Sequence, residues 1–563
     1  MNIFSVLSTA TWALHTSQTE IGVTGQNVAN INNPNYTKET ANIIAGPTQD
    51  YGRYSIGSGI SVANVTSSFS SYLFNQSLDN NTSVASWTAT SGELNQMNQI
   101  MNDTNGTGIS NAISKFFSAF QTLSNNPADA TARQSTVAAG QTLSAQISGA
   151  ATSLGQMQIN ENSNIKALVP KINDISNQIT ALNKEIHQTE NSGNVNNNAR
   201  DQRNGLIKQL SGLTGISYFE QSNGEDVVML KNGTPLVAGE AAYNLSTGIS
   251  KFNPQLTNIY WNSPNGNQTD ITSTISGGQL GALVASRDGA VATALSNLNT
   301  LAGAITTGVN NLNASGYGLD GSTGVNFFNP LTPGGAGAPT NTGTGVITGT
   351  LINQGNVDTS QFNLAFDGTN YTVTNKDQGN ATALSGASFA SVQSFFQQRG
   401  YSISMTGTPK AGDSFSVSAV NNAAVLMSVN STVVNDVNKI AAGSTTQVGD
   451  GTNARLVGNL GTQKIVGGAW SATGTTGSTG VYSLNDYYAS AVGSVGTQTK
   501  TATDNVTLYQ GSAAQTSNLI EQSSGVNMDE EMVNLVKFQN AYQASAKTIT
   551  IVDQMLKTLM NVT

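Results

Sequence analysis

Two runs of apolar and small residues, one at each end of the chain, most constrain how this sequence can fold. Within each run the residues recur at alternating steps of four and three, the heptad spacing that keeps one face of a helix against a partner helix. The first run consists of Ile3, Leu7, Ala10, Leu14, Ser17, Ile21, Thr24, Val28 and Ile31, and the second of Leu535, Phe538, Tyr542, Ser545, Ile549, Val552, Leu556 and Leu559. We call these runs the seams, and they predict two terminal helices that pair with each other.

Local signals bound both helices. Pro34 predicts the end of the first helix, because proline lacks the backbone N–H that an interior position of a helix uses. Asn527 is an N-cap candidate for the last helix, and Glu530 follows it by three residues. Asp529 and Glu531 lie in the first turn, where the helix dipole favours negative charge. Because each seam is narrow and rich in small or hydroxylated residues, neither helix is expected to be stable alone.

Composition excludes several classes of protein. Charged residues make up 10% of the chain, against about 25% in an average soluble protein. The net charge of -9 argues against binding to nucleic acid or anionic lipid. Cysteine is absent, which excludes disulfides and thiolate metal sites. We find neither a long apolar run nor a cleavable leader, so we expect no membrane insertion and, if the protein is exported, no removal of a signal peptide.

The order of the patterns predicts a nested, multidomain α+β fold, in which the terminal helices form a coiled coil and a β domain lies farthest from both ends. A bundle of long helices with a small β-hairpin insert is expected between them. The expected domains are 1–45 with 525–563 (terminal coiled coil), 46–316 with 421–524 (helical rod, β insert at 216–275) and 317–420 (mainly β, distal).

Glycine, proline and the spacing of apolar residues predict smaller features within these domains. Residues 36–70 alternate apolar and polar with glycine punctuation, which predicts an extended connector with short strands. Pro170 interrupts a third heptad run and predicts a kink or break near Val169. A hairpin turn is expected at 231–233, and the glycine-rich run 334–337 lacks the strand-to-helix context of a phosphate loop.

The motifs of catalysis are missing. His15 and His187 lie on separate predicted helices, far apart in the sequence, and do not form a pair at metal-binding spacing. No Gly-Lys dipeptide or His-Glu-x-x-His motif occurs, and the loops 320–323 and 449–453 have the character of turns rather than of calcium loops. We therefore expect no enzymatic activity and no cofactor or metal.

The two ends resemble a known family. Gln18-x-x-Ile21, Asn27-Val28-Ala29-Asn30 and Tyr36-Thr37-Lys38 are similar to the N-terminal signature of bacterial flagellar rod, hook and hook-associated proteins, and Ser524–Glu531, Leu535, Gln539, Ala541, Tyr542, Ala544 and Ala546 to their C-terminal signature. The signature residues carried over are Gln18, Asn27, Ala29, Asn30, Tyr36, Lys38, Gly525, Asp529, Glu530, Gln539 and Ala544.

Two positions depart from the family pattern. Asn35 stands where the family usually has glycine, and asparagine tolerates a left-handed backbone, so the turn is expected to survive. Lys38 stands where the family usually has arginine, which keeps the charge but loses the planar guanidinium.

The resemblance implies a structural role. Long helices inside the terminal pair favour a hook-associated member over a hook protein. Such a member would leave the cell by the flagellar type III pathway, with a chaperone on its C-terminal helix, and would be extracellular, at the junction of hook and filament. Its expected partners are copies of itself in a ring at the hook tip, the hook protein, and a second junction protein on the filament side.

The seams are then candidate contacts of an inner tube. These candidates are Ile3, Leu7, Leu14, Ile21 and Val28 against Leu535, Phe538, Tyr542, Ile549, Val552, Leu556 and Leu559. A coiled coil within one chain is the alternative use of the same residues. Two other functions remain open: another axial protein of hook or distal rod, and a secreted adhesin whose β domain binds glycans.

Overall fold

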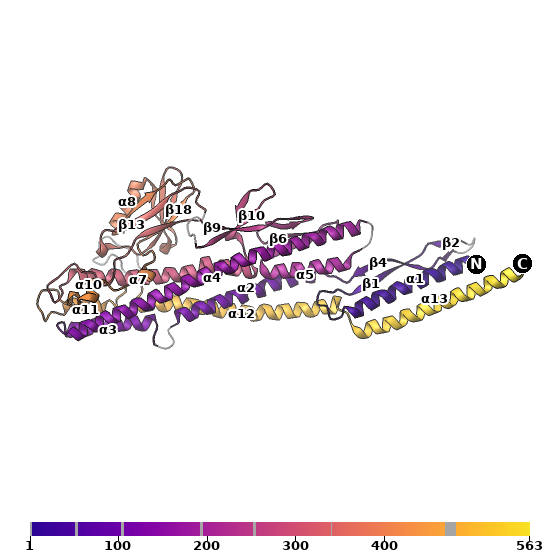
Figure 1. The fold of residues 1–563 in the computed structure, drawn as a ribbon, viewed down its shortest axis with the longest axis horizontal. Helices are drawn as coiled ribbons and strands as arrows, with labels where there is room; N and C mark the ends of the chain where they lie inside the picture. The colour runs from indigo at the N-terminus through magenta and orange to yellow at the C-terminus, as the bar shows by residue number, and fades with distance from the viewer. Residues whose placement is uncertain are drawn as a thin grey trace.

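The protein is an elongated molecule whose two ends lie together at one pole (Figure 1). The computed structural model describes residues 3–50, 55–102, 106–191, 195–250, 255–338, 340–467 and 480–562. The terminal helices α1 (Ile3–Ala29) and α13 (Met528–Val562) pack against each other and extend away from the rest of the chain. The predicted α+β fold with paired terminal helices is therefore confirmed.

Long helices form the body of the molecule. The longest helix, α4, lies beside α3, α5 and α7, and α12 packs along α2. The bounds are α2 Ser71–Met101, α3 Ile109–Asn125, α4 Ala130–Glu190, α5 Asn197–Leu213, α6 Gly278–Ala285, a π-helix Ser286–Ala290, α7 Val291–Ser315 and α12 Leu484–Ser524. Helices α9 (Ala423–Leu426), α10 (Ser431–Asn435) and α11 (Thr452–Asn459) are short and lie near the end of the body remote from the termini.

Of the kink or break predicted near Val169, the break is wrong, because α4 continues through Pro170. A kink at this position stays a prediction. Proline removes one backbone hydrogen bond from a helix interior. Leu168, Val169 and Ile172 are buried on the two sides of it. Packing of this face offsets the lost bond and keeps the helix continuous.

The connector after α1 is a β-hairpin that lies along this helix. Its strands are β1 (Glu39–Ala45), β2 (Thr48–Asp50), β3 (Ser55–Gly57) and β4 (Ile60–Ser67). Strand β1 pairs antiparallel with β4, and β2 with β3. Strands were expected here, and the hairpin covers one side of α1.

The predicted β insert follows α5. Its two small antiparallel sheets have the strand orders β5-β6-β7-β8 and β11-β10-β9. The strands are β5 Ile216–Glu220, β6 Asp226–Leu230, β7 Pro235–Ala238, β8 Ala241–Ala242, β9 Leu245–Ile249, β10 Thr257–Asn262 and β11 Gln268–Asp270. Gly233 has a φ of 85° in the expected turn, a conformation that favours glycine.

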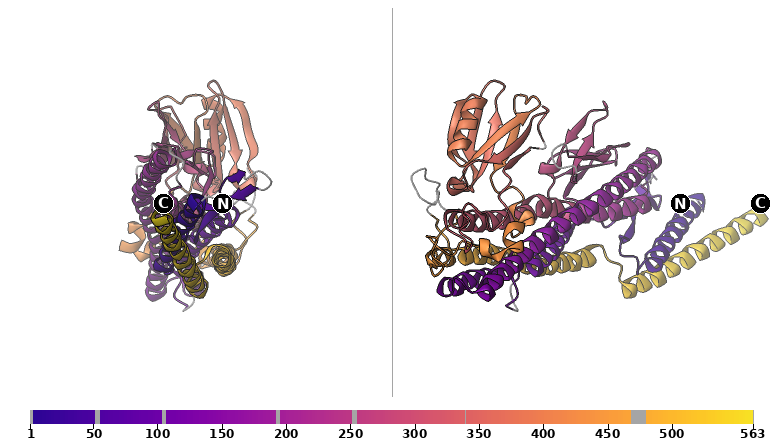
Figure 2. Two further views of the ribbon diagram at one scale, coloured as in Figure 1. Left: turned by 90° about the vertical axis from the view of Figure 1, so that its right-hand side faces the viewer. Right: turned by 60° about the vertical axis from the view of Figure 1, so that its left-hand side comes forward.

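The distal β unit is a seven-stranded antiparallel sheet with one helix, α8 (Phe389–Gln398), packed against it. Its order is β16-β15-β14-β18-β12-β13-β17, and the glycine-rich run 334–337 is the strand β12. The strands are β12 Gly334–Gly337, β13 Val346–Leu351, β14 Gln361–Phe366, β15 Tyr371–Asn375, β16 Ala381–Ala387, β17 Tyr401–Thr406 and β18 Ser414–Ser418. The sheet and the β insert project from the same side of the body (Figure 2).

One hydrophobic core joins the sheet to the helices. Phe362 and Phe396 of the sheet unit belong to the same buried cluster as Phe116 of α3 and Leu301 of α7. The sheet unit and the helical body share this core, so the core does not separate them into domains. The predicted domain limits, including 317–420 for the β domain, stay predictions. No helix within the described ranges combines the length and the hydropathy that a membrane crossing requires.

Candidate assembly site at the paired chain ends

The terminal helices pack antiparallel, so the end of α1 meets the beginning of α13 (Figure 1). Asn527 caps α13 as expected, since its side-chain oxygen accepts a hydrogen bond of 3.0 Å from the Asp529 backbone N–H. α1 ends at Ala29, before Pro34.

The buried residues of the seams are mostly small or hydroxylated. Ala10, Ser17 and Thr24 are buried on α1, as is Val552 on α13. The large seam residues Ile3, Leu7, Leu14, Ile21, Val28, Leu535, Phe538, Ile549 and Leu556 are half-buried. Tyr542 and Leu559 stay 37% and 60% exposed. Two helices and a hairpin bury only part of each seam, and whether other copies cover the rest stays a prediction.

Asn27 organises the place where the two ends meet. It is almost completely buried, and its Nδ2 donates to Glu531 Oε2 at 3.1 Å and to the Glu39 carbonyl at 3.0 Å. Its Oδ1 accepts from the Tyr36 hydroxyl at 2.8 Å and from the Glu39 backbone N–H at 3.0 Å. Burial, followed by the charges of Glu39, Asp201 and Glu531, raises the pKa of Tyr36 and keeps this hydroxyl a donor.

Lys38 adds the charge that this network needs. Its Nζ lies 3.2 Å from Glu530 Oε2 and 3.1 Å from Glu531 Oε1, so one ammonium serves two carboxylates. Burial alone would lower the pKa of Lys38, but the hydrogen bonds to Glu531 and Glu530 outweigh it and raise the pKa. A planar guanidinium is therefore not required to bridge the two helices here.

The joint between the terminal pair and the helical body depends on Thr37. Its backbone N–H and its hydroxyl donate to the two oxygens of Asp201 on α5, both at 2.9 Å. The Lys38 backbone N–H donates to the Ser524 carbonyl at the end of α12, also at 2.9 Å. Burial raises the pKa of Asp201 to about 6, and the bonds from Thr37 oppose this rise.

Asp201 was missed by sequence reasoning, because nothing near it in the sequence marks a partner 164 residues away. Ser524 lies inside the quoted C-terminal signature, but it was not singled out. Glu531 was predicted only as an acidic residue of the first turn of the last helix, and its contact with Asn27 was not predicted.

The turn expected at Asn35 is present, since the Tyr36 backbone N–H donates to the Asn33 carbonyl at 3.1 Å, but Asn35 does not have a left-handed backbone. Among the described residues other than glycine, only Asn380 and Asn422 have a positive φ. The Asn35 side chain instead lies against Gly205 of α5, where an added Cβ would come within 3.1 Å of Asn35 Nδ2. Asparagine here contributes a contact to the helical body.

A cavity of about 850 Å³ lies at this joint. Its lining comes from the segment 30–37, from α2 and α5, and from the end of α12. The terminal pair therefore connects to the body by few contacts around an open volume.

The remaining signature residues are divided between the network and the surface. Asn30 is half-buried and donates to the Gln26 carbonyl at 3.0 Å. Gly525 ends α12, where a Cβ would lie 2.3 Å from the Glu521 carbonyl oxygen. The outward-facing members are Gln18, Ala29, Asp529, Glu530, Gln539 and Ala544.

Comparisons with known proteins agree with this architecture. Residues 94–328 match the family model of the flagellar hook-associated protein FlgK helical domain, and residues 520–562 match the flagellar basal body rod FlgEFG protein C-terminal model. The flagellar hook-associated protein 1 of Escherichia coli (strain K12) is 27% identical over 99% of this chain and 100% of its own length. That of Bacillus subtilis (strain 168) is 26% identical over 99% of this chain and 98% of its own length.

Over nearly its whole length the chain is similar to flagellar hook-associated protein 1. The structure of the flagellar hook junction protein FlgK from Burkholderia pseudomallei has the same fold, with a TM-score of 0.64 and 22% identity over 80% of this chain and 98% of that chain. The resemblance to flagellar hook-associated proteins is confirmed, and so is the preference for them over hook proteins. Members of the hook-associated protein 1 family are structural flagellar proteins.

The sequence motifs set aside for catalysis and calcium lie in ordinary surroundings. Asp450 accepts from the Thr452 backbone N–H at 2.9 Å, and Asp320 accepts from that of Ser322 at 3.0 Å and pairs with Lys439. Both loops are turns closed by an aspartate, as predicted. His15 is exposed on α1.

Proposed function

We propose that this protein is a structural subunit of the bacterial flagellum, which forms a junction ring at the hook tip and adapts the hook to the filament. The observation that carries this proposal is the terminal pair, in which the family signature residues build a joint while much of the apolar surface stays uncovered. Full-length similarity to hook-associated protein 1 supports the junction role.

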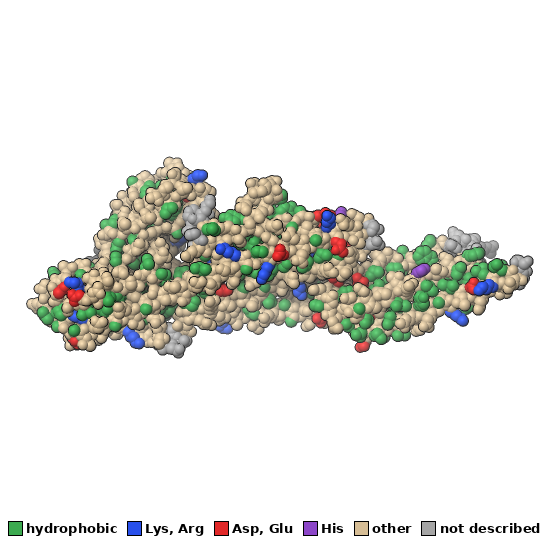
Figure 3. Space-filling view, in the orientation of Figure 1, with side chains coloured by type: hydrophobic (Ala, Val, Ile, Leu, Met, Phe, Trp, Pro, Cys, Tyr) green, Lys and Arg blue, Asp and Glu red, His purple; other side chains and the backbone are tan. Residues whose placement is uncertain are grey.

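The terminal helices α1 and α13 expose large apolar side chains. Phe4 and Trp12 on α1 and Val533, Leu559 and Met560 on α13 are between 52% and 75% exposed. Figure 3 shows hydrophobic side chains spread over this pole of the molecule, with few charges between them. Soluble monomers rarely expose apolar patches of this kind, so we infer that other copies of the chain and neighbouring axial proteins cover them.

The partners follow from this position in the flagellum. Copies of the chain in a ring, the hook protein and a second junction protein on the filament side would contact the terminal pair. A cytoplasmic export chaperone would hold α13 before assembly, when its apolar positions lack α1. The protein would then be extracellular, exported without a cleaved signal peptide, and without enzymatic activity.

Deletion of the gene in its own host tests the proposal. Electron microscopy of purified basal structures should show hooks without filaments, and the medium should contain unpolymerised filament protein. Loss of the hook itself would indicate a rod or hook component instead. Normal filaments would contradict any junction role.

A further inference from the structure

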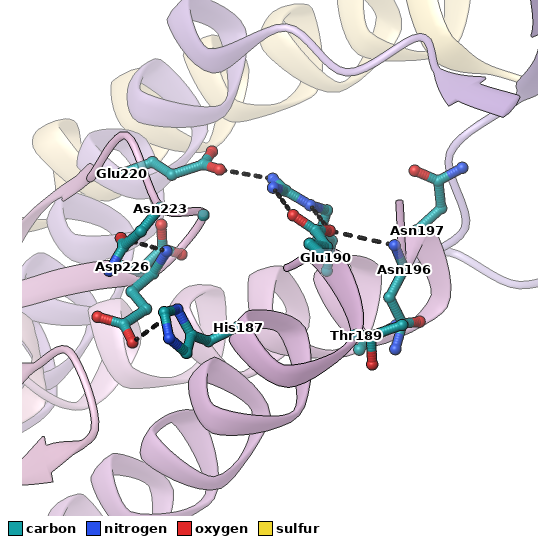
Figure 4. Close-up of polar contacts among 12 residues, drawn as sticks. His187, Thr189, Glu190, Asn196, Asn197, Glu220, Asn223 and Asp226 are labelled. Atoms are coloured by element: carbon teal, nitrogen blue, oxygen red, sulfur yellow. Dashed lines mark hydrogen bonds and ion pairs between the residues drawn. The ribbon is translucent and has the colours of Figure 1, made fainter. Parts of the chain in front are cut away.

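Three metal-ligand side chains meet where the end of α4 contacts two turns of the β insert. His187 lies near the end of α4, Glu225 directly precedes β6, and Glu240 lies in the turn between β7 and β8. One ligand atom from each of the three lies within 4.8 Å of the others. Figure 4 shows the His187 ring turned toward the segment that contains Asn223 and Asp226, at the beginning of β6.

A buried asparagine holds both turns in place. Asn183 lies one helical turn before His187 and is completely buried. Its Nδ2 donates to the carbonyl oxygens of Asp226 and Gly239, each at 2.8 Å, and its Oδ1 accepts from the Asp226 backbone N–H at 3.1 Å. These two residues adjoin the two glutamates, so α4 fixes the turns that present both carboxylates to its own histidine.

The distances fit a small ion. His187 Nδ1 lies 3.5 Å from Glu225 Oε1, and two ligands of a tetrahedral zinc ion with bonds near 2.1 Å lie about 3.4 Å apart. His187 Nδ1 is buried without a hydrogen-bond partner among the described residues. Gly239 leaves room for Glu225, because a Cβ there would lie 2.7 Å from Glu225 Oε2.

The nearby cations are bound to other carboxylates. Arg200 pairs with Glu190 and Glu220 at 2.7 and 2.6 Å (Figure 4). Arg203 pairs with Asp226 at 2.8 Å. Neither arginine neutralises the two glutamates beside His187, which leaves that charge available to an added ion.

We propose that His187, Glu225 and Glu240 form a binding site for a divalent transition metal ion, with zinc as the best match. One imidazole and two carboxylates are ligands that zinc accepts, and Glu240 is exposed and can rotate to complete the set. A bound ion ties the end of α4 to both turns of the β insert, so the insert becomes more rigid against the helical body.

Titration of the metal-free full-length protein with zinc chloride by calorimetry tests this site. The wild type should bind one zinc ion at this site, and His187→Ala and Glu240→Gln should each weaken that binding by at least about 10-fold. His15→Ala is the matched control, because His15 is the other histidine of the chain. It should bind zinc as the wild type does.

A second measurement separates metal binding from loss of fold. Glu240 is exposed, so Glu240→Gln should keep the melting temperature of the metal-free protein. Zinc should raise that temperature in the wild type and slow amide exchange at 223–226 and 239–241, and it should do neither in Glu240→Gln. Equal zinc affinity in the wild type and both variants, or loss of binding in His15→Ala, would overturn the assignment.

Discussion

Lys38 Nζ lies 3.1 Å from Glu531 Oε1, and this ion pair joins the segment after the first helix to the first turn of the last. The Glu531 side chain is 2% exposed, and it contacts Lys38 and the side-chain amide of Asn27. The ion pair therefore connects the two terminal helices where they join the helical body. The N- and C-termini lie at the opposite end of the pair (Figure 1).

Removing the cation of this lock should loosen the base of α13. In Lys38→Gln a buried carboxylate loses its ion pair, which should cost about 1–3 kcal/mol of local stability. Amide exchange at 528–535 should become faster, while exchange in α4 stays the same. Lys557→Gln is the control, because Lys557 pairs with Asp553 on an exposed helix face, and it should change exchange little. Unchanged exchange in Lys38→Gln would show that the ion pair does not hold α13.

The pH dependence of stability should report a buried carboxyl in the helical body. Glu161 is 1% exposed, and burial raises the pKa of this carboxyl to about 8, with Glu93 beside it adding to the rise and the bond from Ser286 opposing it. A folded-state pKa above that of the unfolded chain means that ionisation disfavours the fold. Stability should therefore fall as the pH rises from about 4.5 to about 8.

Glu161→Gln should remove this part of the pH dependence, because glutamine stays neutral and still accepts from Ser286. Thermal melts of the wild type and the variant between pH 5 and pH 9 measure it. The variant should gain stability over the wild type as the pH rises. If the melting temperatures of the wild type and the variant changed with pH in the same way, Glu161 would have the same pKa in the folded and the unfolded state.

The course of α4 through Pro170 gives a third prediction. Replacing Pro170 with alanine restores one backbone hydrogen bond, which should raise the free energy of unfolding by about 1–3 kcal/mol. Lys171→Ala, at an exposed neighbouring position, should change it little. A loss of stability in Pro170→Ala would mean that the proline stabilises the folded protein by more than the restored hydrogen bond does.

Sequence reasoning succeeded where the physical signal is local. The heptad seams and Asn527 predicted α1 and α13, because periodicity and capping act within a few residues. The break that Pro170 allowed did not occur, because buried residues on both sides of the proline hold the helix together. The joint of Thr37 with Asp201 and the meeting of His187 with Glu225 depend on tertiary contacts, and no spacing in the sequence announces them.

The uncovered seams give the last prediction. Leu535→Asp and Leu556→Asp place charges on half-buried positions of α13, so these variants should not enter the junction, whereas the helical body keeps its fold. Gln554→Asp adds the same charge at an exposed position and is the matched control. Complementation of the deletion strain, with electron microscopy of the hooks and circular dichroism of the purified variants, measures both effects. In the isolated wild type, α1 should exchange its amides faster than α4, because its seam is only partly covered. Normal filaments with either leucine variant, or strong protection of residues 3–29 in the monomer, would show that the seams complete their packing within one chain.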